Sequence, residues 1–303
     1  MKIKVSQKDF ICNIRFVRIC NYSYAHTDWI NNGERLHIFK HFHIIKNIIN
    51  DPRKTISVYC KTDFLLQFFN ECKYIQKNII LISGCSDIPI TENIYKHKPN
   101  NIKKWYAENV NYIADDLIPL PLGSHVGTWI GDKKDAEISN HIQYKELIID
   151  NKKNTIINLG FMCFSISTNP NHRMVMYNYF KDKSWVSNLC KIKTGNYLND
   201  YQFLNMIYNH SYVISPFGNG IDCGRTWVSL QLGCIPIIPY HAHFKKMAEH
   251  LPILLFKNIN ELTEEYLLTK LKEFKSKSYS YDYLKISYWK NEIEKNIQEL
   301  NNK

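Results

Sequence analysis

The sequence predicts an α/β protein with two domains, each built around a parallel β-sheet. Its 303 residues leave room for two domains of roughly 150 residues each. In both halves, short apolar runs alternate with segments of helical spacing, a pattern typical of parallel sheets covered by helices on both faces. A polar, charged stretch from about Gly131 to Asn154 separates the halves. We therefore expect domains over residues 1–150 and 151–303, with a cleft between them.

In the first half, strand-like and helix-like segments follow one another along the chain. In order, we expect a strand at 11–19, a helix at 37–49, a strand at 55–60, a helix at 64–72, a strand at 77–82, a short helix at 102–110 and an extended segment at 117–122. The prolines of the last segment, Pro119 and Pro121, suit an edge strand or a strand end.

The second half repeats this alternation. In order, we expect a strand at 155–161, a helix at 171–180, a short strand at 185–186, a helix at 200–208, a strand at 212–214, a helix at 224–232, a strand at 234–238, a helix at 244–250, a strand at 253–256, a helix at 261–274 and a last helix within 281–300. We leave open whether this last helix packs back on the first domain.

The overall charge restricts the classes of partner. The formal net charge is +11, which favours polyanions, membrane surfaces or phosphorylated substrates. Most of the excess is Lys scattered along the chain, as in a generally basic solvated surface. The sequence lacks both a cluster of Arg and Lys on one element and a recognisable aromatic stacking platform. We expect no nucleic-acid partner and at most peripheral membrane contact.

The nine cysteines and the amino-terminal residues bear on the compartment. No C-x-x-C pair occurs, and several cysteines lie in apolar runs, which favours buried free thiols over a disulfide framework or a zinc site. The first ten residues, MKIKVSQKDF, lack the apolar core of a signal peptide, and no run of about 18 apolar residues is present. We expect a cytoplasmic protein.

Residues 212–240, YVISPFGNGIDCGRTWVSLQLGCIPIIPY, form the most informative β-α-β unit. A glycine-rich turn follows its first strand, and Asp222 is expected to cap the next helix. The backbone N–H groups at such a helix start attract anions, phosphates especially. The glycines alone are consistent with a simple tight turn. Arg225, however, lies in the first helical turn, where a cation opposes the helix dipole, and this favours a phosphate-binding corner of a nucleotide-sugar site.

Two further residues stand where an α/β site should lie. Arg173 begins another expected helix and could clamp a diphosphate together with Arg225. The alternative is an exposed surface arginine. Asp87 follows the 77–82 strand and could act as general base toward a sugar hydroxyl. The alternative is a turn-forming Asp, and His125 competes for the same role.

The sequence offers little to hold a metal ion. It contains no Asp-x-Asp motif, with which metal-dependent glycosyltransferases usually bind a divalent ion. His241 and His243 have the spacing of a ligand pair, but no acid accompanies them, and we expect ordinary loop residues. We therefore expect neither a metal nor another cofactor, with cationic side chains and helix dipoles stabilising a departing diphosphate.

Four segments together resemble exostosin-like glycosyltransferases. Residues 215–238, SPFGNGIDCGRTWVSLQLGCIPII, resemble the donor-site signature of that family, and residues 164–173, FSISTNPNHR, resemble its arginine-bearing segment. LISGCSDIPI and KKWYAENV with LIPLPLG resemble acceptor-domain blocks, so the resemblance spans about residues 55–290. It implies a GT-B fold of two Rossmann-like domains, the first for the acceptor and the second for a nucleotide-sugar. It also implies metal-independent, usually inverting transfer to a glycan hydroxyl, with a UDP-sugar as the expected donor.

The resemblance assigns roles residue by residue. Donor binding falls on Arg173, Ser215, Gly218, Asn219, Gly220, Asp222, Arg225 and Thr226, and proton abstraction falls on Asp87. Gly224 and Val228 depart from the family pattern, which usually has His and Glu there. That Glu typically binds the ribose hydroxyls. Val228 therefore leaves an alternative open, a weakened or non-enzymatic relative that binds a glycan or a nucleotide.

Overall fold

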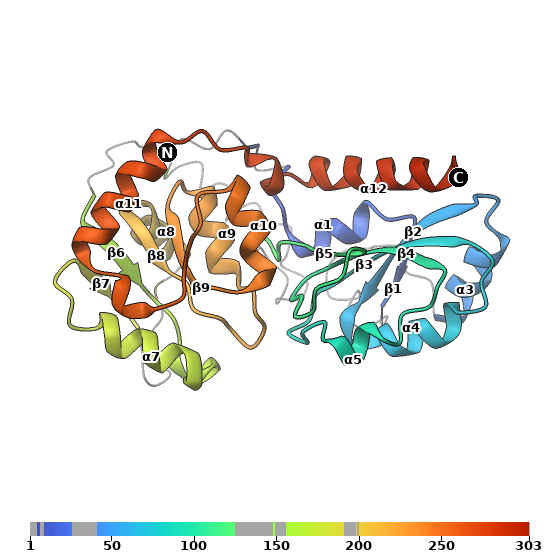
Figure 1. The fold of residues 1–303 in the computed structure, drawn as a ribbon, viewed down its shortest axis with the longest axis horizontal. Coiled ribbons are helices and arrows are strands. Elements are labelled where there is room, and N and C mark those ends of the chain that lie inside the picture. The colour runs from blue at the N-terminus through green and yellow to red at the C-terminus, as the bar shows by residue number, and fades with distance from the viewer. Residues whose placement is uncertain are drawn as a thin grey trace. The chain divides into compact units, whose positions relative to one another are not determined.

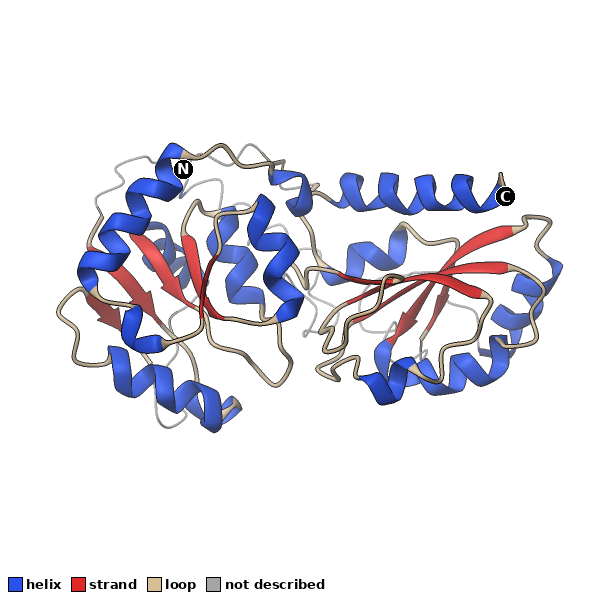
Figure 2. Cartoon of the chain, in the orientation of Figure 1, coloured by secondary structure: helices blue, strands red, loops and turns tan. Residues whose placement is uncertain are grey.

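The computed structural model describes residues 5–6, 9–25, 41–124, 148, 156–190, 198 and 200–302. The chain divides into two compact units, one of Asp9–Glu137 with Leu284–Lys303 and one of Met1–Lys8 with Ile138–Tyr283 (Figure 1). Each unit contains a parallel sheet of five described strands with helices around it (Figure 2), which confirms the predicted α/β class. We call them the β1–β5 unit and the β6–β10 unit. The domain boundary predicted near residue 150 lies outside the described residues.

In the β1–β5 unit the strands lie in the order β1-β2-β3-β4-β5, and each neighbouring pair is parallel. The strands are β1 Tyr22–Tyr24, β2 Thr55–Lys61, β3 Asn78–Gly84, β4 Ile102–Ala107 and β5 Leu117–Pro119. The helices are α1 Asn13–Arg18, α3 His41–Asn50, α4 Leu65–Cys72, α5 Glu92–Tyr95 and α12 Ile286–Asn301, with a 3-10 turn at Thr62–Phe64. The strands predicted at 55–60 and 77–82 are confirmed, and β5 is an edge strand among those described.

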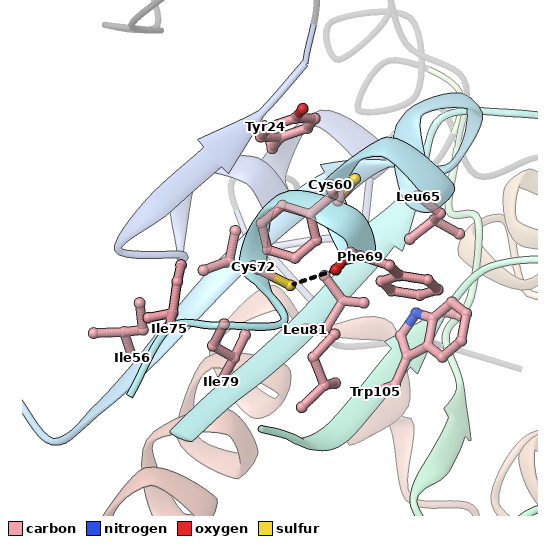
Figure 3. Close-up of a cluster of buried hydrophobic side chains, with 14 of the residues drawn as sticks. Tyr24, Ile56, Cys60, Leu65, Phe69, Cys72, Ile75, Ile79, Leu81 and Trp105 are labelled. Atoms are coloured by element: carbon pink, nitrogen blue, oxygen red, sulfur yellow. Dashed lines mark hydrogen bonds between the residues drawn. The ribbon is translucent and has the colours of Figure 1, made fainter. Parts of the chain in front are cut away.

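Helices bury both faces of this sheet. Figure 3 shows one face, where Phe69 and Cys72 of α4 pack against strand residues such as Leu81 and Trp105. On α12, which packs against β2 and β3, the Trp289 ring lies 6.4 Å from the ring of Tyr106 in β4. The last helix of the chain therefore belongs to the core of the β1–β5 unit.

Two of the predictions for this unit are wrong. Residues 11–19 contain helix α1 in place of a strand, because a six-residue helix is too short to show helical periodicity. Residues 102–110 contain strand β4 in place of a helix. Trp105, Tyr106 and Ala107 are all buried, and a strand buried on both faces loses the alternation that distinguishes it from a buried helix.

The β6–β10 unit has the strand order β10-β9-β8-β6-β7, again with parallel pairs throughout. The strands are β6 Asn158–Met162, β7 Val186–Asn188, β8 His210–Ile214, β9 Ile235–Pro239 and β10 Leu254–Phe256. The helices are α7 Pro170–Phe180, α8 Asp200–Tyr208, α9 Gly224–Gln231, α10 Ala242–His250 and α11 Glu264–Ser276, with 3-10 turns at Ile166–Thr168, Ile259–Glu261 and Tyr281–Leu284. The helices and strands predicted for this half are confirmed, with small shifts at their ends.

The direction of winding reverses between β6 and β8. The chain passes from β6 to β7 on one side of β6, and then returns to place β8 on the other side. Phe180 of α7 packs in the cluster that contains Tyr212, whereas Leu204 of α8 packs in the cluster that contains Val213, so α7 and α8 cover opposite faces. Open α/β sheets bind ligands outside the carboxyl ends of their strands at such a reversal. The described strands of the β1–β5 unit contain no reversal.

Free thiols were also predicted, and all nine cysteines are free in the structure. Cys12, Cys60, Cys72 and Cys234 are buried, where they pack as small apolar side chains. None of the helices in the described ranges combines the length and apolar character needed to cross a membrane.

Candidate phosphate-binding site

Arg173 connects the loop after β6 to the loop after β8, at the point where the direction of winding reverses, which we call the switch point. It lies in the first turn of α7, which Pro170 opens, and only 5% of its surface is exposed. Its Nε donates to the carbonyl of Phe217 at 2.9 Å, and its Nη1 donates to the carbonyl of Ser165 at 2.7 Å. The loop after β6 and the loop after β8 are therefore held together by one guanidinium group.

Arg225 approaches the same place from the start of α9. Its Nε donates to the carbonyl of Cys163, the residue that follows β6, at 3.1 Å. The guanidinium carbons of Arg225 and Arg173 lie 5.4 and 5.8 Å from the centre of the Phe164 ring. The two cations therefore share one aromatic ring. The sequence predicts that both arginines begin helices, and the structure brings their side chains together.

This pair of cations is not neutralised by carboxylates within the described part of the chain, where neither arginine forms an ion pair with Asp or Glu. Burial, and secondly the charge of Arg225, lower the pKa of Arg173 to about 10. Arg173 therefore remains charged at neutral pH although it is buried beside another cation. A bound anion would relieve that repulsion, so the arrangement is electrostatically suited to a phosphate group.

The glycine-rich loop leaves space beside Arg173. Gly218 and Gly220 are buried while Asn219 between them is exposed. A Cβ atom on Gly218 would lie 3.4 Å from Nη2 of Arg173, in van der Waals contact, so the loop passes directly beside the guanidinium group. The side chain of Asn169 donates to the carbonyl of Gly218 at 2.7 Å and fixes the loop against the start of α7.

Ser215 and Thr226 lie at the two ends of this loop, and their side chains are in contact. Both side chains are buried, and their hydroxyl oxygens lie 2.9 Å apart. Oγ of Ser215 also lies 3.2 Å from Sγ of Cys223. In this arrangement the two hydroxyls join the end of β8 to the first turn of α9, which positions Arg225.

Asp222 follows the glycine-rich loop along the chain, and it is not the N-cap that the sequence predicts. Cys223 is the N-cap of α9, and its side chain makes no capping hydrogen bond to a backbone N–H of the helix. Asp222 is 4% exposed, and its Oδ1 accepts the N–H of Cys223 at 2.7 Å. Its two oxygens also accept the indole N–H of Trp227 at 2.9 and 2.8 Å. Asp222 therefore accepts hydrogen bonds from one backbone N–H and one indole.

His243 was predicted to be an ordinary loop residue, and this is wrong. It lies in α10, fully buried, with Nε2 3.7 Å from Oδ2 of Asp222. His241 is the N-cap of the same helix, and its Nδ1 accepts the backbone N–H of His243 at 3.1 Å. The expectation that no acid accompanies the two histidines is also wrong, because Asp222, which is distant in the sequence, lies beside His243.

Val228 supplies nothing polar to the site. It is 6% exposed and packs in an apolar cluster with Phe161, Leu204 and Val213. The position that usually holds a ribose-binding Glu in the resembling family is therefore part of the core in this chain.

Asp87 belongs to the β1–β5 unit, in the exposed loop after β3. The end of β4 holds that loop. Oε2 of Glu108 accepts the N–H of Cys85 at 2.8 Å, and the side chain of Asn109 donates to the carbonyl of Ser86 at 2.8 Å. Cys85 and Asn109 both have positive φ angles, 55° and 53°, a strained conformation for residues other than glycine.

Sequence reasoning missed several residues of these two regions. Phe164 lies within the segment 164–173 that resembles the arginine-bearing segment of the family. The contact of its ring with two arginines, however, leaves no signal in the sequence. Glu108 is 2% exposed and was missed because its segment was predicted to be a helix. Its position directly after a buried strand could have identified it. His125 lies outside the described residues.

Among the residues that the structure describes, no group of three or more His, Cys, Asp or Glu side chains is arranged to hold a metal ion. Comparison with known proteins finds no protein-family model that matches the chain and no curated protein similar to it.

Proposed function

We propose that the protein is a glycosyltransferase that transfers a sugar from a nucleoside diphosphate donor, with UDP as the expected nucleotide, to a glycan hydroxyl. In this proposal the two units form a GT-B enzyme that needs no metal ion and inverts the anomeric centre. The β6–β10 unit binds the donor, and the β1–β5 unit binds the acceptor.

One observation carries the donor assignment: Arg173 and Arg225 meet over Phe164 at the switch point, with no carboxylate partner among the described residues. Nucleoside diphosphates are the ligands that a two-arginine site of this kind suits, because the diphosphate carries two negatively charged groups. The helix starts of α7 and α9 add backbone N–H groups beside the same place.

The reaction assigned to this site is a single displacement. The oxygen of an acceptor hydroxyl forms a bond to the anomeric carbon while the bond from that carbon to the diphosphate oxygen breaks. Asp87 takes the hydroxyl proton, and the arginines stabilise the charge that develops on the departing diphosphate. Asp87 is proposed for this role because it is an exposed carboxylate in a loop that Glu108 and Asn109 hold in place.

A thermal-shift panel of nucleotide-sugars, with UDP and GDP alone, tests the donor assignment. A donor at 100 times its Kd adds about 2.7 kcal/mol to the free energy of unfolding, which is easily measured. At least one UDP- or GDP-sugar should raise the melting temperature. If no nucleoside diphosphate does so, the proposal is wrong.

Substituting Arg225→Ala tests the role of the cations. We expect kcat/KM to fall by about two to three orders of magnitude, as when one charge-stabilising donor is removed from a transition state. Lys183→Ala, an exposed cation of the same unit, is the matched control and should transfer normally. Near wild-type transfer by Arg225→Ala would contradict the assignment.

A second candidate is a relative that binds a nucleotide or a glycan without transfer. Val228 favours it, because the site lacks the usual carboxylate for the ribose hydroxyls. Release of free sugar or of glycosylated product from any UDP- or GDP-sugar in the panel would exclude this candidate. Binding without either product would support it.

A further inference from the structure

A buried carboxylate and a buried indole lie directly behind the proposed phosphate site. Asp222 and Trp227 belong to the same stretch of chain, and the indole N–H points at both oxygens of the carboxylate, at 2.9 and 2.8 Å. Trp227 is fully buried and lies in α9, two residues beyond Arg225. The contact therefore links the residue before the N-cap of α9 to the helix itself.

The charge of Asp222 has a consequence for anion binding. A carboxylate two residues before the start of a helix would repel a phosphate at that helix start. Here the carboxylate accepts the N–H of Cys223 at 2.7 Å and the indole N–H, and Nε2 of His243 lies 3.7 Å away. The two N–H donors stabilise the carboxylate where it lies and fix the backbone from residue 222 to residue 227.

We propose that Trp227 and Asp222 are positioning residues for the diphosphate: the hydrogen-bonded pair fixes the first turn of α9, so that Arg225 and the helix start face the ligand. Neither residue is assigned a contact with the donor. This inference rests on the proposed function, since it concerns the same nucleoside diphosphate site.

A double-mutant cycle with UDP as the probe tests it. The variants are Trp227→Phe, Asp222→Asn and the two combined, with Kd measured by calorimetric titration and the melting temperature measured separately. Trp227→Phe leaves a carboxylate with one donor fewer and should raise the Kd of UDP about tenfold, the effect of removing one partner of a charged hydrogen bond. Asp222→Asn places an amide N–H against the indole N–H and should also raise Kd.

The combined variant shows whether the two residues act through their shared hydrogen bond. That bond is already lost or disturbed in each single variant, while the Asn oxygen of the combined variant still accepts the N–H of Cys223. We expect its Kd to be raised about tenfold, no more than that of Trp227→Phe, because the two substitutions remove the same interaction. A Kd within about threefold of wild type would show that the hydrogen-bonded pair does not position the ligand, and would overturn the inference. Trp185→Phe is the matched control, since Trp185 is a buried indole of the same unit outside the site.

Each outcome decides one of the two proposals. If wild type binds UDP, Arg225→Ala does not, and Trp227→Phe binds as Trp185→Phe does, the positioning role is wrong while the phosphate site stands. If wild type binds no nucleoside diphosphate, both fall. Should Trp227→Phe not fold, Asp222→Asn alone decides, and an unchanged Kd overturns the inference.

Discussion

At the scale of single residues, the two arginines of the site are not equivalent. Arg173 donates to the carbonyls of Phe217 and Ser165, whereas Arg225 has one backbone partner, the carbonyl of Cys163. We expect Arg173→Ala to lower both UDP affinity and the melting temperature, because it leaves two carbonyls without their donor. Arg225→Ala should lower affinity with a smaller effect on melting.

The conservative variant Arg173→Lys separates charge from geometry. Lysine keeps the positive charge but lacks the planar fork that reaches two carbonyls at once. It should recover less than half of the lost melting temperature, as measured by differential scanning fluorimetry. Full recovery of both melting and affinity would show that only the charge of Arg173 matters.

Two histidines are expected to make the free energy of unfolding depend on pH. Burial lowers the pKa of His210, and burial together with His243 lowers the pKa of His241, both from an ordinary value of 6.5. The folded state therefore binds fewer protons than the unfolded state once the pH falls below that value. Their contribution to stability is complete above about pH 6.5 and is lost as the pH falls further.

Urea unfolding between about pH 7.5 and pH 5 measures this effect, because carboxylates with lowered pKa values change the free energy of unfolding only at lower pH. The free energy of unfolding should decrease across the window. His241→Asn keeps a side-chain acceptor at the start of α10 without a titrating group, and should flatten the decrease. An unchanged slope in His241→Asn would assign the effect to other groups.

At the scale of elements, the contact between the ends of β3 and β4 leads to a prediction about the free energy of unfolding. A Cβ atom on Gly84 would lie 2.5 Å from the carboxyl carbon of Glu108, too close without a shift of the carboxylate. Gly84→Ala should therefore lower the free energy of unfolding by about 1–3 kcal/mol, the usual cost of overpacking. Chemical denaturation measures it.

Gly160→Ala is the control for this substitution, because the nearest atom to its Cβ would be a side-chain carbon of Val186 at 3.3 Å, a contact that a much smaller shift relieves. Glu108→Ala in the Gly84→Ala background should recover part of the loss by removing the clash. If Gly84→Ala were no more destabilising than Gly160→Ala, the close approach of Glu108 would be refuted.

How much of each element could be predicted depended on where its residues pack. Helices with one apolar face, such as α8, have the bounds that the sequence predicts. Strand β4 was mistaken for a helix because both of its faces are buried, and its pairing with β3 and β5 is not visible in local sequence. Asp222 was mistaken for an N-cap because its carboxylate accepts the indole N–H of Trp227, a side-chain contact that a capping pattern does not show.

At the scale of the whole molecule, the arrangement of the proposed donor site could be predicted only in part. The glycine-rich turn and Arg225 were visible in one β-α-β unit. The meeting of Arg173 and Arg225 follows from the strand order, in which β8 pairs with β6 although β7 comes between them in sequence. Strand order depends on pairings between distant segments, which one sequence does not reveal.

The division into units leads to a final prediction about unfolding. Trp289 of α12 is buried against Phe16 and Tyr106, within the core of the β1–β5 unit. Trp289→Ala should destabilise that unit by about 3–5 kcal/mol, the usual cost of removing a buried aromatic side chain. Because each unit has its own core, scanning calorimetry should resolve a transition for each, and Trp289→Ala should lower only one. Saturating UDP should raise only the other, since the proposed nucleotide site lies entirely within the β6–β10 unit. A single transition moved by both changes would mean that the two cores unfold together.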